Sequence, residues 1–230
     1  MSEEGTYAAS DFNSSDFYWK NGLKYYNDDK YTSHIGIDVS EHQGTIDWKK
    51  VKNAGIQFAM IRVGFSGEKD GTITEDSCFD QNLKNAKAAG LDVGVYFYSN
   101  AVSADEAVAE AKFVIEKIRR NGIRYPVAYD MEIEQNSRDS TLTSKQRTEI
   151  STAFCQVVSQ NGYKPILYGN PTYFSSNVDL SYLTEYDLWL AHYVNISSFP
   201  YKFMMWQYSS TGKLPGISTS CDMDIAFISK

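Results

Sequence analysis

Residues 121–133, Asn-Gly-Ile-Arg-Tyr-Pro-Val-Ala-Tyr-Asp-Met-Glu-Ile, contain both the structural unit and the chemistry that organise this sequence. Gly122 follows an amphipathic stretch, and glycine at that position commonly ends a helix in the left-handed conformation. The apolar run after it predicts a buried strand. This strand ends on Asp130 and Glu132, which are two residues apart and therefore point to the same face. The stretch thus predicts a helix, a strand and a pair of acids in succession.

The same helix–glycine–strand arrangement occurs at three other places. Gly55, Gly90 and Gly162 each follow a predicted helix and precede an apolar residue and a strand. Ser103 and Thr143 begin two of the helices with the capping-box sequences Ser-Ala-Asp-Glu and Thr-Ser-Lys-Gln. Repeated units of this kind predict parallel strands with the helices packed outside them.

Eight runs have the composition of strands, and these cover 35–39, 57–63, 93–98, 126–131, 165–169, 187–193, 203–208 and 222–228. Eight strands that alternate with helices suit a closed barrel of the TIM type. The last two connections lack helical periodicity, so the final strands should lack helices and the last should run antiparallel. The sequence therefore predicts an α/β fold, a modified TIM-like β/α barrel of eight strands and about five helices.

The first part of the chain has a different composition, rich in Tyr, Asn, Asp and Ser. Asn21-Gly22 stands between two aromatic arms and predicts a β-hairpin with a two-residue turn. We therefore divide the chain into an N-terminal extension, residues 1–33, whose hairpin packs on the main domain, and a barrel domain, residues 34–230. Met1-Ser-Glu-Glu looks like the cut edge of a longer chain.

The overall composition excludes several classes of partner. The net charge of −7 and the pI near 5.0 argue against binding to nucleic acid or to an anionic membrane surface. No apolar run is long enough to span a membrane. Cys78, Cys155 and Cys221 lack metal-ligand spacing, and we expect all three thiols to be free, with Cys155 in the core. We expect no cofactor, no metal and a monomer.

In barrels of this type the chemistry lies at the carboxyl ends of the strands. Strand alternation turns the small and polar residues of the first and fourth strands inward, which predicts that Asp38, Asp130, Glu132 and Asp222 converge at one mouth. Taken alone, Asp38 and Asp222 are better explained as turn formers or helix caps than as functional residues, and Asp224 competes with Asp222 for its role. Two acids on one inward face are harder to explain without a function.

Aromatic residues accompany the acids at the strand ends. Candidates for stacking on sugar rings are Tyr96, Tyr98, Tyr168, Trp189, Tyr193 and Trp206, with Gln207 as a polar neighbour. The alternative is that these rings are ordinary strand packing. The sequence contains no Gly-rich phosphate loop, no Gly-x-Ser-x-Gly elbow and no paired metal-binding histidines.

These residues resemble glycoside hydrolase family 25, the Chalaropsis-type lysozymes or N-acetylmuramidases. The resemblance rests on residues 36–48 and 94–99, on Asp130-Met-Glu132, on residues 189–193 and 206–208, and on the late Asp222. It implies a modified β/α barrel that hydrolyses the β-1,4 bond between N-acetylmuramic acid and N-acetylglucosamine in peptidoglycan glycan strands. Asp224 departs from the family pattern, which usually has Asn there.

The resemblance also implies roles for the four acids. Glu132 matches the general acid, Asp130 the second central carboxylate, and Asp38 and Asp222 the two flanking acids. We expect crowding and burial to keep Glu132 protonated while Asp130 stays ionised. Asp130 then stabilises the transition state, attacks it, or orients the 2-acetamido group of the substrate to do so. We expect the protein to act outside the cell or at its surface.

Two other functions fit the same residues at this stage. A chitinase-like glycosidase also places acids at a strand end in a β/α barrel. A non-catalytic module that binds cell-wall sugars would keep the aromatic residues but would not need Asp130 and Glu132 together.

Overall fold

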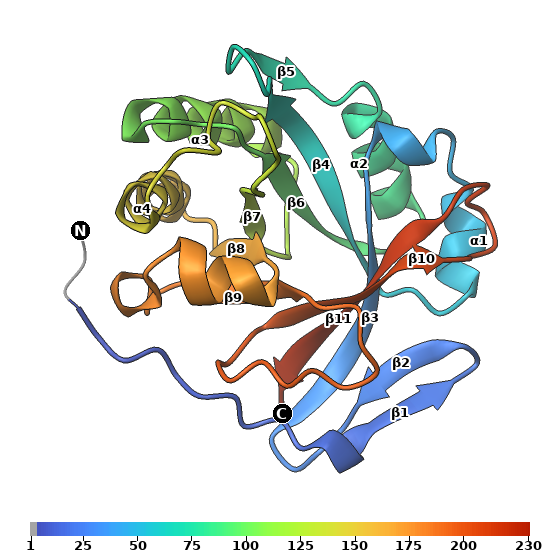
Figure 1. Ribbon diagram of the computed structural model, residues 1–230. Helices are drawn as coiled ribbons and strands as arrows, with labels where there is room; N and C mark the ends of the chain where they lie inside the picture. Colours follow the sequence, from blue (N-terminus) through green and yellow to red (C-terminus); the bar gives the residue numbers. More distant parts are fainter. Residues whose placement is uncertain (1–3) are drawn as a thin grey trace.

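The computed structural model describes residues 4–230, and its centre is a closed barrel of eight strands (Figure 1). In chain order the strands are β3 (Tyr31–Val39), β4 (Phe58–Ser66), β6 (Asp92–Tyr98), β7 (Val127–Asp130), β8 (Pro165–Gly169), β9 (Asp187–Ala191), β10 (Met205–Gly212) and β11 (Cys221–Ser229). Around the barrel their order is β3-β11-β10-β9-β8-β7-β6-β4, and pairing of β3 with β4 closes it. The predicted fold class and all eight strands are confirmed.

The direction of the last strand is also as predicted. β11 pairs antiparallel with both β10 and β3, whereas the other pairs within the barrel are parallel. The start of β11 therefore lies at the same mouth as the carboxyl ends of the other strands. A short strand that the sequence did not predict, β5 (Ile73–Glu75), adds to the outer end of β4 as an antiparallel edge.

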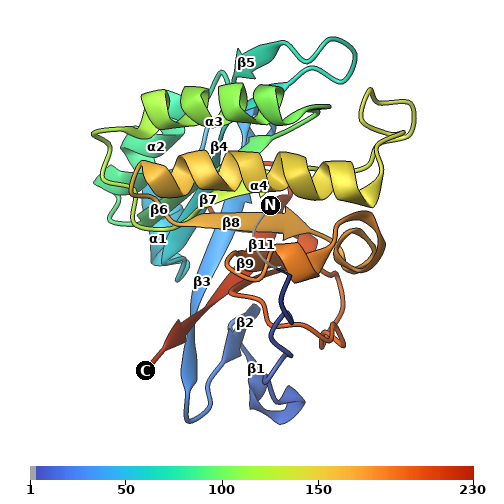
Figure 2. The ribbon, with the colours of Figure 1, turned by 90° about the vertical axis from the view of Figure 1, so that its left-hand side faces the viewer.

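Helices cover the first part of the barrel and are absent from the last connections, as expected. The α-helices are α1 (Trp48–Asn53), α2 (Phe79–Ala88), α3 (Ala104–Ile118) and α4 (Ser144–Gln160), and the π-helical segment η3 (Tyr173–Asn177) is a fifth. Short 3-10 turns lie at Ser14–Asp16, Glu41–Gln43 and Leu180–Tyr182. In Figure 2, α3 and α4 run side by side across one face of the barrel.

The four helix-ending glycines have the backbone conformation that the sequence predicted. Gly55, Gly90, Gly122 and Gly162 have φ values of 102°, 82°, 58° and 81°, which is the region where a Cβ causes strain. Thr143 forms the complete capping box with Gln146, because each side chain binds the backbone of the other. These signals are local, and this explains why they can be read from sequence alone.

Two apolar clusters separate the inside of the barrel from its outside. The inner cluster includes Phe58, Ala128 and Trp189, while Val127 and Tyr129 belong to the outer cluster beneath the helices. This is the alternation that the sequence predicted for the fourth strand. Apolar packing fills the lower barrel, so polar side chains have space only at its mouth.

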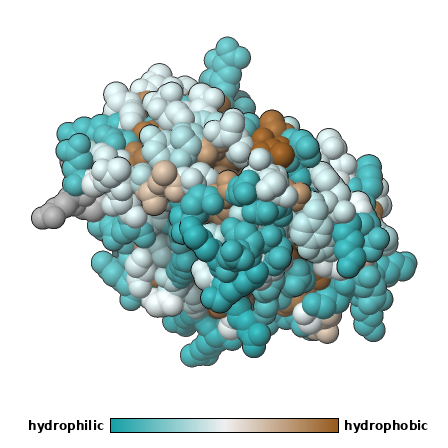
Figure 3. All heavy atoms as spheres, turned by 90° about the horizontal axis from the view of Figure 1, so that it is seen from below, coloured by the Kyte–Doolittle hydropathy of each residue, from teal (hydrophilic) through white to brown (hydrophobic). Residues whose placement is uncertain are grey.

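The N-terminal hairpin consists of β1 (Phe17–Lys20) and β2 (Leu23–Tyr26). Asn21 and Gly22 both have positive φ, as a type I′ turn requires. The hairpin lies at the lower end of the molecule as drawn in Figure 1, and the view of that end in Figure 3 shows a mostly hydrophilic surface with small hydrophobic patches. β3 begins at Tyr31, so the first barrel strand crosses the boundary expected between residues 33 and 34.

Lys24 attaches the hairpin to the barrel. Only 1% of this residue is exposed, and its ammonium group lies 4.1 Å from the centre of the Trp206 ring. The same group donates to the backbone carbonyls of Val194 and Asn195 in the loop between β9 and β10. Burial lowers the pKa of Lys24 to about 8. A buried ammonium with these partners joins two segments that are far apart in sequence.

We expect the Lys24→Met variant to lower the free energy of unfolding by about 1–3 kcal/mol. Methionine keeps much of the apolar stem but leaves the two carbonyls without their charged donor. Chemical denaturation monitored by circular dichroism measures the difference, with exposed Lys20→Met on the same hairpin as the control. Equal stability of the two variants would contradict this role of Lys24.

The cysteines lie as the sequence predicted. Cys78, Cys155 and Cys221 are free thiols, and Cys155 is buried on α4. Within residues 4–230, no helix has both the length and the apolar character needed to cross a membrane.

Candidate active site

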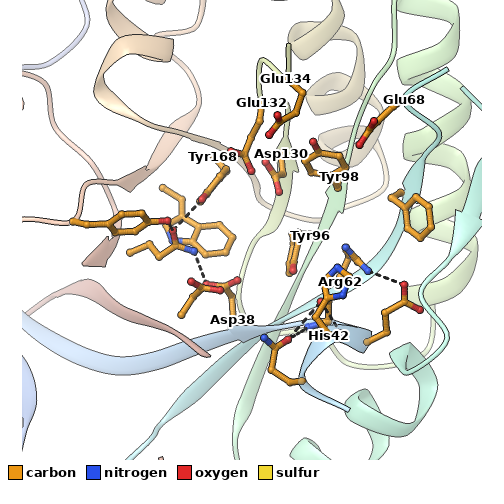
Figure 4. Close-up of a pocket in the computed structure, with 18 residues that line it drawn as sticks. Asp38, His42, Arg62, Glu68, Tyr96, Tyr98, Asp130, Glu132, Glu134 and Tyr168 are labelled. Atoms are coloured by element: carbon orange, nitrogen blue, oxygen red, sulfur yellow. Dashed lines mark hydrogen bonds and ion pairs between the residues drawn. The ribbon is translucent and has the colours of Figure 1, made fainter. Parts of the chain in front are cut away.

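A cavity of about 530 Å³ opens at the carboxyl ends of the parallel strands (Figure 4). All four predicted acids line it: Asp38 from β3, Asp130 from β7, Glu132 just after β7, and Asp222 from the start of β11. Asp38 and Asp222 are opposite each other in the antiparallel pair of β3 and β11. The structure therefore brings together acids from both ends of the chain.

Asp130 and Glu132 lie together at the end of β7, across the cavity from Asp38 (Figure 4). β7 ends at Asp130, so Glu132 stands on the irregular segment that follows it. Asp130 is 5% exposed, and its Oδ1 atom has no hydrogen-bond partner among residues 4–230. An unpartnered carboxylate oxygen at this depth costs free energy, which is typical of a site built for a reaction and not for stability.

Burial raises the pKa of both members of this pair. The pKa of Asp130 is well above its usual value because of burial and of nearby Glu132, and Arg62 opposes the shift. The pKa of Glu132 is raised by burial, by Glu134 and by Asp222. The two carboxyls therefore keep a proton between them at a pH where isolated carboxyls would both be ionised.

The expectation that Asp130 stays ionised while Glu132 holds the proton stays a prediction, because burial raises the pKa of both carboxyls. Asp130 is deeper than Glu132 and lacks a donor, so its pKa is raised at least as clearly. Both carboxyls of the pair therefore favour the protonated form more than isolated carboxyls do. The sequence indicates on which face of the strand the two acids lie, but it does not indicate how deeply each of them is buried.

Gln207 connects Asp38 to two aromatic residues of the cavity. Its amide nitrogen donates to Asp38 Oδ2 at 2.7 Å. Its amide oxygen accepts from the hydroxyls of Tyr168 at 2.9 Å and Tyr193 at 2.7 Å. Because two donors occupy the oxygen, the amide has one orientation, and this holds the two tyrosines and Asp38 in place.

Asp222 and Asp224 lie at different depths, which settles which of them reaches the mouth. Asp222 lines the cavity, whereas Asp224 is 0% exposed and accepts a hydrogen bond from Trp189 Nε1 at 2.8 Å. Burial raises the pKa of Asp224 to about 8. Among the described residues its Oδ2 atom has no hydrogen-bond partner, and the nearby Asp224 carboxyl is one of the causes that raise the pKa of Asp38.

We expect Asp224→Asn to stabilise the protein increasingly as the pH rises. The unfolded carboxyl ionises near pH 4, so between about pH 4 and 8 the folded state holds a proton that the unfolded state has lost, and stability falls with rising pH. Asparagine removes this loss and still accepts from Trp189. Thermal melts across this range should show a gain of at least about 1 kcal/mol at the alkaline end. Parallel pH profiles for the two proteins would contradict the raised pKa of Asp224.

Arg62 is a site residue that the sequence reasoning missed. It points into the cavity from β4, is 9% exposed, and binds Asp76 at 2.8 Å and Glu41 at 3.2 Å. Its charge lowers the pKa of Asp130. The available signal was an arginine at an inward position of an otherwise apolar strand. Loop residues Glu41, His42, Gln43, Glu68 and Glu134 also line the cavity, and no sequence pattern indicated them.

Five of the predicted aromatic residues line the cavity with Gln207: Tyr96, Tyr98, Tyr168, Trp189 and Tyr193. Trp206 does not, and we withdraw it as a sugar-binding residue. It is 0% exposed on the outside of the barrel, where it covers Lys24 and donates to the carbonyl of His192 at 2.8 Å. Because Gln207 faces inward, its neighbour Trp206 must face outward.

A second cavity of about 500 Å³ adjoins the first and shares Glu132, Tyr168 and Tyr193 with it. Its other walls include Asn170, Thr172 and His192. Glu132 thus lies where the two cavities meet. This is the position expected of an acid that acts on an internal bond of a chain-like ligand. Among residues 4–230, no group of three or more His, Cys, Asp or Glu side chains is arranged to hold a metal ion.

Comparison with known proteins gives a consistent set of relatives. Residues 37–217 match the family described as glycosyl hydrolases family 25. Uncharacterized protein YegX of Escherichia coli K12 is 28% identical over 200 residues, covering 85% of this chain and 70% of that protein. Lysozyme M1 of Streptomyces globisporus is 28% identical over 200 residues, covering 81% of this chain and 65% of that protein.

A solved structure is similar over most of the fold. The modular autolysin LytC from Streptococcus pneumoniae superposes with a TM-score of 0.74 at 25% identity, covering 92% of this chain and 52% of the autolysin. The present chain therefore spans about half the length of that protein. The same autolysin has been solved in complex with a synthetic peptidoglycan ligand.

Proposed function

The chain belongs to family 25 of the glycosyl hydrolases, and from this premise we propose that it is a peptidoglycan hydrolase of the lysozyme type. The bond cleaved is the β-1,4 bond between N-acetylmuramic acid and N-acetylglucosamine. The observation that carries the proposal is the crowded pair Asp130 and Glu132 where two cavities meet. The names of Lysozyme M1 and of the LytC autolysin support the substrate class. We assign the activity to the barrel domain, residues 34–230.

In the proposed reaction Glu132 is the general acid. It donates its proton to the glycosidic oxygen as the bond from that oxygen to the anomeric carbon breaks. Its raised pKa keeps the proton available at a higher pH than an isolated glutamic acid would, and its place between the cavities gives it access to the leaving group. Water then adds to the anomeric carbon, and Glu132 recovers its proton in that step.

Asp130 is the partner carboxylate in this proposal. Once the proton of the pair lies on Glu132, Asp130 carries the negative charge and faces the positive charge that develops on the sugar ring. The charge is not dispersed by any hydrogen bond to Oδ1. Asp38 and Asp222 flank the ring and are held by the Gln207 network and by their pairing across β3 and β11.

The aromatic side chains supply the sugar-binding walls. Tyr96, Tyr98, Tyr168, Trp189 and Tyr193 offer ring faces and hydroxyls around the acids, with Gln207 fixing two of them. Rings with few rotatable bonds bind at low entropic cost. We propose that the protein works as a monomer outside the cell or at its surface, where peptidoglycan is accessible.

A turbidity assay on purified bacterial walls tests the function. We expect the wild-type protein to clear a suspension of walls and to leave chitin intact. Clearing of chitin with no action on walls would instead support a chitinase-like enzyme. Binding to walls without new reducing ends would support a non-catalytic sugar-binding module.

A further inference from the structure

Exposed large hydrophobic side chains gather beside the cavity. Trp19 of β1 is 54% exposed, and in the loop after β9 Tyr193, Val194 and Ile196 are 54%, 37% and 42% exposed. We call these four residues the hairpin–loop surface. The indole nitrogen of Trp19 donates to the side chain of Asn195 at 3.3 Å, so the hairpin and the loop form one continuous face.

Hydrogen bonds from buried side chains hold this surface in place. Lys24 binds the carbonyls of Val194 and Asn195, and Trp206 binds the carbonyl of His192. Within the loop, the His192 ring and the Ser197 hydroxyl are 3.0 Å apart. The exposed rings are therefore presented in a fixed arrangement before any ligand arrives, which lowers the entropic cost of binding.

Tyr193 makes the surface continuous with the site. It lines both cavities while its ring remains largely exposed, and its hydroxyl is fixed on Gln207. A glycan strand that leaves the cavities over Tyr193 comes next to Asn195 and Trp19. We propose that the hairpin–loop surface is an additional glycan-binding subsite, which takes N-acetylated sugar units of the substrate strand beyond those at the scissile bond. This inference rests on the proposed function.

The chemistry of the surface favours a glycan over another protein. Its exposed aromatic rings, an indole N–H and an amide suit the apolar faces and polar edges of hexosamines. Figure 3 shows only small hydrophobic patches on the hairpin end of the molecule, whereas the surface of an obligate protein interface is more hydrophobic. Trp19 lies before residue 37, where the family match begins, so the N-terminal extension of this chain contributes one part of the subsite and the loop after β9 contributes the other.

The experiment compares hydrolysis of long glycan strands with that of short oligomers that fill only the cavities. We expect Trp19→Ala to raise KM for long strands about tenfold with little change in kcat, and to leave the kinetics on short oligomers unchanged. Ile196→Ser should act in the same direction more weakly. Trp19→Phe should restore most of the affinity, because it keeps a ring at this position.

Tyr18→Ala is the matched control. Tyr18 is 46% exposed on the same strand as Trp19. Because successive side chains of a strand point to opposite faces, Tyr18 lies on the other face of the hairpin, where it stacks on Tyr25. This variant should leave both substrates unaffected. Circular dichroism and thermal melting confirm that each variant is folded.

Three outcomes would overturn the proposed subsite and leave the proposed function intact. These are an unchanged KM for long strands in Trp19→Ala and Ile196→Ser, an equal loss on short and long substrates, and a change in oligomeric state by light scattering instead of in glycan affinity. Absence of hydrolysis of both substrates by the wild-type protein would overturn the proposed function, and this subsite with it.

Discussion

Glu132→Gln should lower kcat on purified peptidoglycan by about 10²–10⁴-fold, because glutamine cannot donate a proton to the leaving oxygen. Glu132 is the acid that stands where the two cavities meet, so no other carboxyl in the described part of the chain has the same access to an internal glycosidic bond. The side chains have nearly the same shape, and the substitution also removes charge crowding. The folded structure and the binding of the glycan should therefore be preserved.

The nature of the leaving group gives this prediction a second readout. An aryl glycoside leaves without strong acid assistance, so the loss in Glu132→Gln should be much smaller on such a substrate than on peptidoglycan. Glu134→Gln is the comparison variant, since Glu134 raises the pKa of Glu132 through its charge. It should keep the maximum rate and move the alkaline limb of the pH profile to lower pH. Wall hydrolysis by Glu132→Gln within tenfold of wild type would exclude Glu132 as the acid.

Asp130→Asn should lower kcat by about 10²–10⁴-fold while KM changes little. The negative charge at this position matters when the sugar ring becomes positive, and the ground-state sugar is neutral. A variant that acts through binding would instead raise KM at constant kcat. Single-turnover rates and direct binding of glycan oligomers separate these two cases.

Stability provides an independent check on Asp130. The residue is 5% exposed, and its Oδ1 atom has no donor within the described residues 4–230. Its pKa is raised by burial and by Glu132. Removing this charge should leave the melting temperature unchanged or raise it, as is common when a strained functional group is replaced. A marked loss of stability together with a pure binding defect would show that Asp130 has a structural role.

Much of this architecture follows from short-range signals. The helix-ending glycines and the Asn21-Gly22 turn depend on local backbone preference, and alternation along β3 and β7 gives the inward faces. The lack of helices in the last connections predicted the antiparallel β11. Together these features place Asp38, Asp130, Glu132 and Asp222 at one mouth. Each signal needs only a few neighbouring residues.

The remaining features depend on register and depth, which local patterns do not contain. Asp222 and Asp224 have the same parity, and only their pairing with Asp38 and Gly36 shows that Asp224 lies deeper. The salt bridges of Arg62 join segments that are distant in the chain. Trp206 is a different case, because strand alternation with Gln207 already required it to face outward. Its assignment was wrong for a reason visible in the sequence.

The most direct measurement is the identity of the new reducing ends in a peptidoglycan digest. After digestion by the wild-type protein, borohydride reduction and mass spectrometry show which sugar carries each new end. Cleavage of the proposed bond leaves N-acetylmuramic acid at the reducing end, so N-acetylmuramitol should accumulate with wild type and not with Glu132→Gln. New ends consisting of reduced N-acetylglucosamine, or equal accumulation of N-acetylmuramitol with both proteins, would contradict the account.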